Sequence, residues 1–186
     1  MDIKLFDNRI LAPSKCGTRY LRKVYSDKRF DINVDNINNI THIIVRNPYE
    51  HFESALHTEY INYKTTNDTM DGVHHIMDGV ITPNGIGHWH PQLYRFLYSI
   101  FNKNKSIKVI DLSQLSSFLK SEGYDMVYDK SEYDWSSFSH WKSKEEVISD
   151  LKNEFKNEFK IIEDKLQSEL IYYDKLVNMQ VLNEIL

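Results

Sequence analysis

The sequence has little cysteine, glycine, proline and arginine for its length of 186 residues. Its one cysteine, Cys16, excludes a disulfide within the chain, which is typical of a reducing compartment. Lysine and arginine (23 together) are outnumbered by aspartate and glutamate (27), so no overall positive field favours nucleic acid. No apolar run approaches the ~20 residues of a membrane span, and the first residues lack the apolar region of a signal peptide. We therefore expect a cytoplasmic protein that binds neither nucleic acid nor membranes.

Strand-like and helix-like runs alternate through most of the chain. Strands are expected at 9–12 (with a second short run before it), 30–34, 42–46 and 107–111. Helices are expected at 18–25, 49–63, 91–101, 113–121 and 144–186, the last with a break near 167–168. This alternation predicts an α/β fold in one domain, residues 1–186. We expect three layers, P-loop-like, with a central parallel sheet flanked by helices.

Two segments are predicted to lack regular structure. Residues 65–87 are polar, contain four glycines and are predicted to form a long loop, which is often functional. Residues 123–141 are irregular and aromatic. Their rings either stack on a sugar or an adenine or close over the core as a lid. We expect the two segments to build the acceptor pocket.

A candidate anion-binding loop follows the first strands, in the sequence LAPSKCGTRYL of residues 11–21. It lacks the spacing G-x-x-x-x-G-K-[ST] of nucleotide triphosphatases. Gly17 lets the backbone approach an anion closely, the first N–H groups of the helix at Thr18 point toward it, and Lys15 supplies a positive charge. The alternative is a Pro/Gly turn capped by Thr18, with Lys15 in solvent.

A second candidate anion site lies in IIVRNPYEHFES, residues 43–54. Its apolar start predicts a buried parallel strand, and Pro48 predicts the first turn of a helix. Arg46, at the end of the strand, suits a bidentate contact with a phosphate, and Ser54 adds a hydroxyl donor about two helical turns later. Ligands of parallel sheets bind beyond the carboxyl ends of the strands. The two segments together therefore predict a ligand with phosphate-like groups at two ends.

These segments resemble the donor-binding loops of sulfotransferases that use 3′-phosphoadenosine 5′-phosphosulfate (PAPS). The first loop of that family has the form P-K-x-G-T-[ST]-[WY]-L, and residues 13–21 read PSKCGTRYL. The second has the form R-[ND]-P-x-x-R-x-x-S, and residues 46–54 read RNPYEHFES. A third segment, HWHPQ at 88–92, resembles the H-W-x-P-Q segment of the carbohydrate sulfotransferase branch. The matches run in order from Arg9 to about Leu119 and are most similar to a compact bacterial or viral member.

The resemblance implies transfer of a sulfuryl group from PAPS to a hydroxyl of an acceptor, with a saccharide expected from HWHPQ. The nucleotide product is 3′-phosphoadenosine 5′-phosphate (PAP). Lys15 would neutralise the oxygen that leaves sulfur, and no metal is implied. The donor-binding residues that the resemblance implies are Lys15, Cys16, Gly17, Thr18, Arg19, Tyr20, Arg46 and Ser54.

The chain departs from the family pattern at three positions. Ser14 is an extra residue between Pro13 and Lys15, and Arg19 replaces a hydroxyl residue. His51 replaces the second arginine of the second motif. We expect these changes to affect the affinity for the donor more than its identity.

Several side chains are candidates for the general base that activates the acceptor hydroxyl. Imidazole titrates near neutral pH, so His88 and then His90 are the first choices for this catalytic role. The alternative is that His88 and Trp89 brace the substrate loop. The reserve candidates are His57, Glu59, Asp27, Asp31 and Asp35.

Two other functions stay open beside the sulfotransferase. A P-loop-like kinase or nucleotide hydrolase would need the Walker pattern and an aspartate motif for Mg²⁺, neither of which the sequence contains. A catalytically inactive module that binds PAP would keep the two loops without a base. A metal site at His74, His75, His88 and His90 would lack a cysteine or acidic partner at a recognisable spacing, so we expect none.

Overall fold

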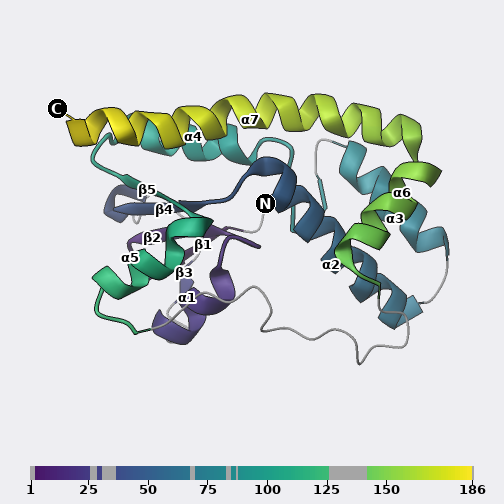
Figure 1. The fold of residues 1–186 in the computed structure, drawn as a ribbon, viewed down its shortest axis with the longest axis horizontal. Helices are drawn as coiled ribbons and strands as arrows, with labels where there is room; N and C mark the ends of the chain where they lie inside the picture. Colours follow the sequence, from purple (N-terminus) through teal and green to yellow (C-terminus); the bar gives the residue numbers. More distant parts are fainter. Residues whose placement is uncertain are drawn as a thin grey trace.

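The structure is a computed structural model that describes residues 3–25, 29–30, 37–67, 70–82, 85–86, 88–125 and 142–185. Within these residues it is an α/β fold with a small mixed sheet and seven helices (Figure 1). The strands are β1 (Ile3–Phe6), β2 (Ile10–Pro13), β3 (Arg29–Phe30), β4 (His42–Val45) and β5 (Lys108–Asp111). The helices are α1 (Thr18–Tyr25), α2 (Pro48–Asn67), α3 (Met70–Ile81), α4 (Leu93–Lys103), α5 (Leu115–Ser121), α6 (Lys144–Glu154) and α7 (Lys156–Ile185). Two short 3-10 helices are η1 (Ile37–Asn39) and η2 (Leu112–Gln114).

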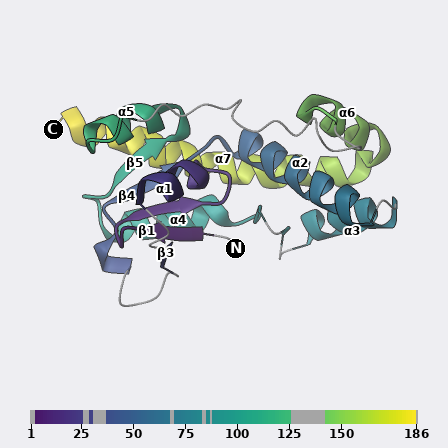
Figure 2. The same cartoon turned by 90° about the horizontal axis from the view of Figure 1, so that it is seen from below.

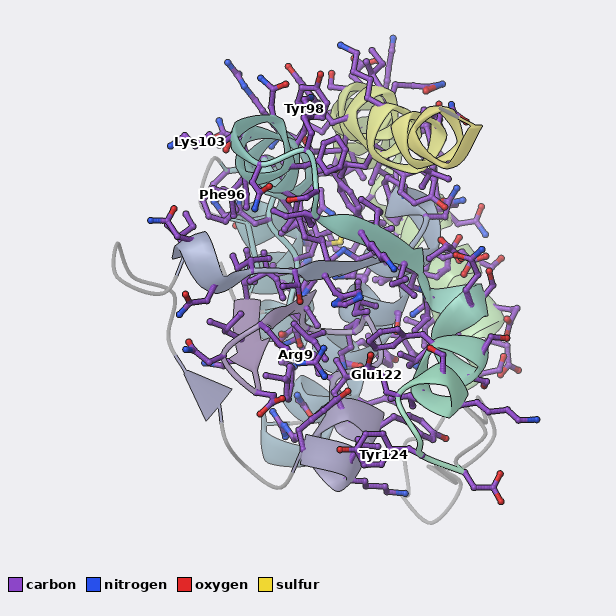
Figure 3. The ribbon with its side chains drawn as sticks, turned by 90° about the vertical axis from the view of Figure 1, so that its left-hand side faces the viewer. Arg9, Phe96, Tyr98, Lys103, Glu122 and Tyr124 are labelled. Carbon is purple, nitrogen blue, oxygen red and sulfur yellow. The ribbon has the colours of Figure 1, made fainter. Side chains whose placement is uncertain are left out.

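The sheet has the strand order β3-β1-β2-β4-β5, in which β2, β4 and β5 are parallel. β1 is antiparallel to β2 and β3, so the sheet is mixed, whereas the sequence predicted a parallel one. A tight turn reverses the chain after β1, because Asp7 and Asn8 both have positive φ (49° and 55°) and the Arg9 N–H donates to the Phe6 carbonyl at 3.0 Å. Arg9 also pairs with Glu122 at the end of α5 (Figure 3).

Helices pack on both faces of the sheet. Successive strand residues point to opposite faces, so Leu5 and Ile43 lie in an apolar cluster with α4 and α7, and Phe6 and Ile44 lie in one with α1 and α5. Figure 3 shows α4 and α7 on one side of the sheet and α1 and α5 on the other. The continuous apolar run of β4 is therefore buried on both faces, as the sequence predicted.

A third apolar cluster joins α2, α3, α6 and α7 beside the sheet (Figure 2). Phe52 and Trp89 both belong to it, with their ring centroids 5.2 Å apart. Helix α7 belongs to both parts of the molecule, because Ile162 packs in this cluster and Leu176 packs against the sheet. No helix in the described part of the chain is both long enough and apolar enough to cross a membrane.

Most elements lie where the sequence predicts them. Helix α1 has the predicted bounds, and Pro48 begins α2. The strands β2, β4 and β5 and the helices α4 and α5 begin and end within two residues of the predicted bounds. Residues 31–34 of the predicted strand 30–34 and residues 126–141 of the predicted irregular segment lie outside the described residues.

The predicted loop at 65–87 is wrong for most of its length, because α2 continues to Asn67 and α3 spans Met70–Ile81. Ile76, Met77 and Val80 form the buried face of α3, at a helical spacing. Gly79 lies inside this helix, and a Cβ there would come within 3.2 Å of the Ile86 side chain. This glycine therefore makes room for the chain that follows and does not end the helix.

The predicted break at 167–168 is also wrong. The C-terminal helical region divides at Phe155, whose φ of −110° and ψ of 49° leave helical geometry and whose ring is buried. Helix α6 begins with a capping box, in which Ser143 and Glu146 exchange two hydrogen bonds. The Ser168 hydroxyl donates to the Asp164 carbonyl within the continuous helix α7.

Polar contacts hold α4 and α7 to the carboxyl end of the sheet. Glu169 of α7 is 3% exposed, and its Oε2 accepts the Tyr94 N–H of α4 at 2.6 Å. The Tyr94 hydroxyl donates to the Arg46 carbonyl just after β4. The Tyr173 hydroxyl of α7 donates to Oδ2 of Asp111, at the end of β5, at 2.7 Å. These contacts fix where β4 and β5 end.

Glu169 should make the stability of the fold depend on pH. Burial raises the pKa of its carboxyl from 4.5 to about 7. The folded state thus binds this proton more tightly, and the stabilisation is complete below about pH 4.5 and lost as the pH rises through about 7. We expect Glu169→Gln to be more stable than the wild type at pH 8, by on the order of 1–3 kcal/mol, and similar to it near pH 4.5. Urea unfolding at both pH values measures the difference.

The matched control is Glu163→Gln on the exposed side of α7. This variant should keep the pH dependence of the wild type. If Glu169→Gln kept it as well, the buried carboxyl would not be its source.

Candidate active site

Three parallel strands end at the same edge of the sheet and bring the segments that follow them together. β2 leads into residues 14–17, β4 leads into Arg46 and Asn47, and β5 leads into η2. Ligands of such sheets bind beyond the carboxyl ends of the strands. Because β2 and β4 pair directly, the two predicted anion-binding segments are neighbours.

Residues 13–16 form a tight turn between β2 and α1. The Cys16 N–H donates to the Pro13 carbonyl at 3.1 Å. Lys15, the third residue of the turn, has a φ of 65°, whereas the φ of Ser14 is not positive. This is the pattern of a type II turn. A non-glycine residue in the left-handed region costs about 1–2 kcal/mol, so Lys15 is held in an unfavourable conformation where the sequence predicts an anion.

Gly17 follows the turn with a φ of 74° and lies against α5. A Cβ at this position would come within 2.5 Å of Leu115 Cδ2, so any other residue would need Leu115 to move and would be strained at this φ. In the described part of the chain, the N–H groups of Gly17 and Thr18 have no hydrogen-bond acceptor. They precede the eight-residue helix α1, whose N-terminal end is partially positive. This end of the turn has the donors that an anion requires.

Arg46 lies against the same turn. Its Nη1 donates to the Lys15 carbonyl at 3.3 Å, and its Nε donates to Oε2 of Glu50 at 3.3 Å. Its side chain is 12% exposed, so a small part of it is open to solvent. Asn47 accepts the Tyr49 N–H at 3.0 Å and so caps the start of α2. The two basic residues of the two predicted loops therefore meet at one turn.

His51, one turn into α2, also contacts this turn. Its Nε2 lies 2.8 Å from the Ser14 carbonyl, which can only accept, so Nε2 carries the proton. The side chain is 1% exposed, and in the described part of the chain its Nδ1 has no partner. Burial lowers the pKa of His51 to about 4, so the ring is neutral at physiological pH. The sequence had marked His51 only as a departure from a motif.

His88 also lies close to Ser14. Its Nδ1 is 3.5 Å from the Ser14 Oγ, and its Nε2 is 4.0 Å from Oε1 of Glu59 in α2. The next residue, Trp89, is 2% exposed and exchanges two backbone hydrogen bonds with Ile86. The buried indole therefore anchors the segment that presents His88 to the turn.

Two of the predicted donor-binding residues, Cys16 and Tyr20, are buried. Cys16 is 0% exposed and Tyr20 is 5% exposed, both in the cluster beneath α1. Their N–H groups donate to the Pro13 and Gly17 carbonyls. Burial also raises the pKa of the Cys16 thiol to about 12. The groups of the first loop that face the predicted anion position are therefore the Lys15 side chain and the N–H groups of Gly17 and Thr18, with the partly buried Arg19 beside them.

In the described part of the chain, no hydrogen bond joins His90 or Ser54 to the turn. His90 Nδ1 accepts the Gln92 N–H at 3.2 Å, at the start of α4. Ser54 lies two turns into α2, and its carbonyl accepts the Thr58 hydroxyl at 3.0 Å. In the described residues no hydrogen bond joins Ser54 to Arg46.

The reserve candidates for the general base also differ in the contacts that they make. Glu59 faces His88, whereas His57 donates its Nε2–H to the Lys142 carbonyl at 3.0 Å. Burial lowers the pKa of His57. Asp27, Asp31 and Asp35 lie outside the described residues.

No protein-family model matches the chain, and no curated protein and no solved structure is similar to it. The functional interpretation therefore depends on the three motifs and on the contacts around the turn.

Two substitutions of Lys15 should separate backbone strain from charge. Lys15→Gly removes both, because glycine adopts positive φ without cost, whereas Lys15→Ala removes the charge alone. We expect Lys15→Gly to be more stable than Lys15→Ala by about 1 kcal/mol. Chemical denaturation of the two variants measures this difference. Equal stability would mean that the turn does not hold residue 15 at positive φ.

Proposed function

We propose that the chain is a cytoplasmic sulfotransferase that transfers the sulfuryl group of PAPS to a hydroxyl of a saccharide and releases PAP. The contact of Arg46 with the Lys15 carbonyl carries this proposal, because it joins the two motifs at one turn. A donor with phosphates at its 3′ and 5′ positions needs cationic groups on neighbouring strand ends. Helices on both faces of the sheet, with a site at its carboxyl edge, support a three-layer, P-loop-like architecture.

Different groups around the turn suit different parts of the sulfuryl-transfer reaction. The N–H groups of Gly17 and Thr18 suit the 5′-phosphate, and the Arg46 guanidinium suits the second phosphate. The Lys15 ammonium would neutralise the oxygen that leaves when its bond to sulfur breaks. By analogy with phosphoryl transfer, the protein positions the reactants and stabilises charge. Contacts of Arg19 and Ser54 with the donor remain predictions.

His88 is a better candidate than His90 for the general base. It lies beside the turn, between the Ser14 hydroxyl and the Glu59 carboxylate. A carboxylate at one imidazole nitrogen orients the ring and stabilises its protonated form. We infer that an acceptor hydroxyl in place of the Ser14 Oγ would give its proton to Nδ1 of His88.

The contacts of Asp111 favour this function over nucleotide hydrolysis or phosphoryl transfer. Those reactions use an aspartate near the phosphates to hold Mg²⁺. Asp111 ends the neighbouring strand β5, but its Oδ1 accepts the Ser113 N–H and hydroxyl at 2.9 and 2.6 Å. Its Oδ2 accepts the Tyr173 hydroxyl at 2.7 Å. Both oxygens are engaged within the protein.

A thermal-shift titration with PAP, ADP and ATP-Mg²⁺ tests the donor. A ligand at 100 times its Kd adds about 2.7 kcal/mol, which is roughly 5–10 °C for a chain of this length. We expect this shift with PAP, little with ADP, and a loss of the PAP shift in Arg46→Ala. Arg22→Ala, exposed on α1, is the matched control and should respond like the wild type. A shift with ATP-Mg²⁺ alone would favour a kinase, and no shift with any nucleotide would refute the proposed site.

Lys15→Ala distinguishes an enzyme from an inactive binding module. Slow hydrolysis of PAPS to PAP and sulfate requires no acceptor and is measured by chromatography. If Lys15 stabilises the leaving oxygen, its loss should lower this rate by about 100-fold or more, while the PAP thermal shift is only reduced. Lys120→Ala, exposed on α5, should retain the rate. A wild-type protein that binds PAP without any turnover would be a binding module.

A further inference from the structure

The turn of residues 13–16 is held through two successive carbonyl groups. The Ser14 carbonyl accepts from Nε2 of His51 at 2.8 Å, and the Lys15 carbonyl accepts from Nη1 of Arg46 at 3.3 Å. Arg46 lies in the segment that joins β4 to α2, and His51 lies in the first turn of α2. The neighbouring strand and helix therefore determine which way the peptide groups of the turn face.

The Ser14–Lys15 peptide is the middle peptide of this turn. Types I and II differ by a flip of that peptide, which changes the sign of φ at the third residue. Lysine favours type I, because a positive φ is unfavourable for any residue with a Cβ. The observed turn has Lys15 at 65°. A tertiary contact must compensate for the cost of this positive φ. The hydrogen bond from His51 to the Ser14 carbonyl is the contact that a flip of the Ser14–Lys15 peptide would break.

The chemical state of His51 suits such a contact. The carbonyl requires a proton on Nε2, and Nδ1 is left as a buried lone pair without a partner in the described part of the chain. Arg46, Lys15 and His88 all disfavour a charge on this ring. The imidazole is therefore a neutral donor with one fixed tautomer. It is packed against the Tyr94 ring, with the centroids 6.1 Å apart.

We propose that His51 is a positioning residue that holds the Ser14–Lys15 peptide in the type II orientation and so fixes the anion-binding turn. Without its N–H the peptide flips, Lys15 relaxes to negative φ, and the backbone that leads to the Gly17 and Thr18 donors changes direction. The extra Ser14 and the histidine at position 51 are two departures from the sulfotransferase pattern. In the structure these two residues form one contact with each other. The effect on ligand binding rests on the proposed function, whereas the effect on the turn does not.

The wild-type protein gives the first test, by NMR at neutral pH. The ¹⁵N shifts of the His51 ring should report a proton on Nε2 and a bare Nδ1. The turn should show a strong contact between the Ser14 Hα and the Lys15 amide proton, and a strong contact between the Lys15 amide and α protons. A proton on Nδ1, or a turn with the proton contacts of type I, overturns the proposal without any variant.

Three variants give the second test. His51→Phe keeps a ring without a donor, and the type I proton contacts should replace those of type II. His51→Gln offers an amide N–H in place of Nε2–H and should preserve the wild-type contacts. His57→Phe is the matched control, because it removes a histidine-to-carbonyl bond from the same helix, at Lys142. It should leave the Lys15 signals unchanged. Type II contacts retained in His51→Phe overturn the proposal.

Binding of PAP to the same variants separates this inference from the proposed function. We expect the PAP Kd to rise at least tenfold in His51→Phe and to stay within about threefold of the wild type in His51→Gln and His57→Phe. If the wild type does not bind PAP but the turn still flips in His51→Phe, the proposed sulfotransferase function is refuted. The positioning role of His51 then remains supported. An unchanged PAP Kd in a flipped His51→Phe refutes the functional role of the contact.

Discussion

The hydrogen bond from the Tyr94 hydroxyl to the Arg46 carbonyl is the contact on which the candidate site depends. Tyr94 is fully buried, and burial raises the pKa of its phenol well above 10, so the hydroxyl remains a donor. The bond fixes the backbone where β4 ends, and from there Arg46 reaches the Lys15 carbonyl. Glu169 of α7 in turn fixes the start of the helix that contains Tyr94. A long C-terminal helix thus sets the geometry of a turn near the N-terminus.

Much of the fold could be predicted from local patterns. The apolar run of β4, the proline at the start of α2 and the spacing of α1 depend on short stretches of sequence. The predictions of secondary structure are wrong where tertiary packing determines the local conformation. Gly79 suggested a loop but is the small residue that α3 needs beside Ile86. Asp7 and Asn8 together adopt the left-handed turn that sets β1 antiparallel, a conformation more typical of glycine.

The candidate site could be predicted in part, for a related reason. Lys15 and Gly17 share one short strand–turn–helix segment, and the pairing of β2 with β4 brings Arg46 beside them. The contacts of His51 with Ser14 and of His88 with Glu59 join residues far apart in sequence, so no local spacing indicates them. The predicted roles of Cys16 and Tyr20 depended on which peptide and side-chain groups face outward. That direction is set by the type II geometry and by burial against α5, which the motif does not specify.

The burial of Cys16 makes it an internal reporter of the turn. Thiol reagents attack the thiolate, and a fully buried thiol with a pKa of about 12 offers almost none of it. The residue is the one cysteine in the sequence, so alkylation of the whole protein measures a single position. It proceeds only through molecules in which the backbone around Cys16 has opened. The ratio of its rate to that of the unfolded chain gives the free energy of this local opening. A ligand that closes over the turn would therefore protect the thiol without touching it.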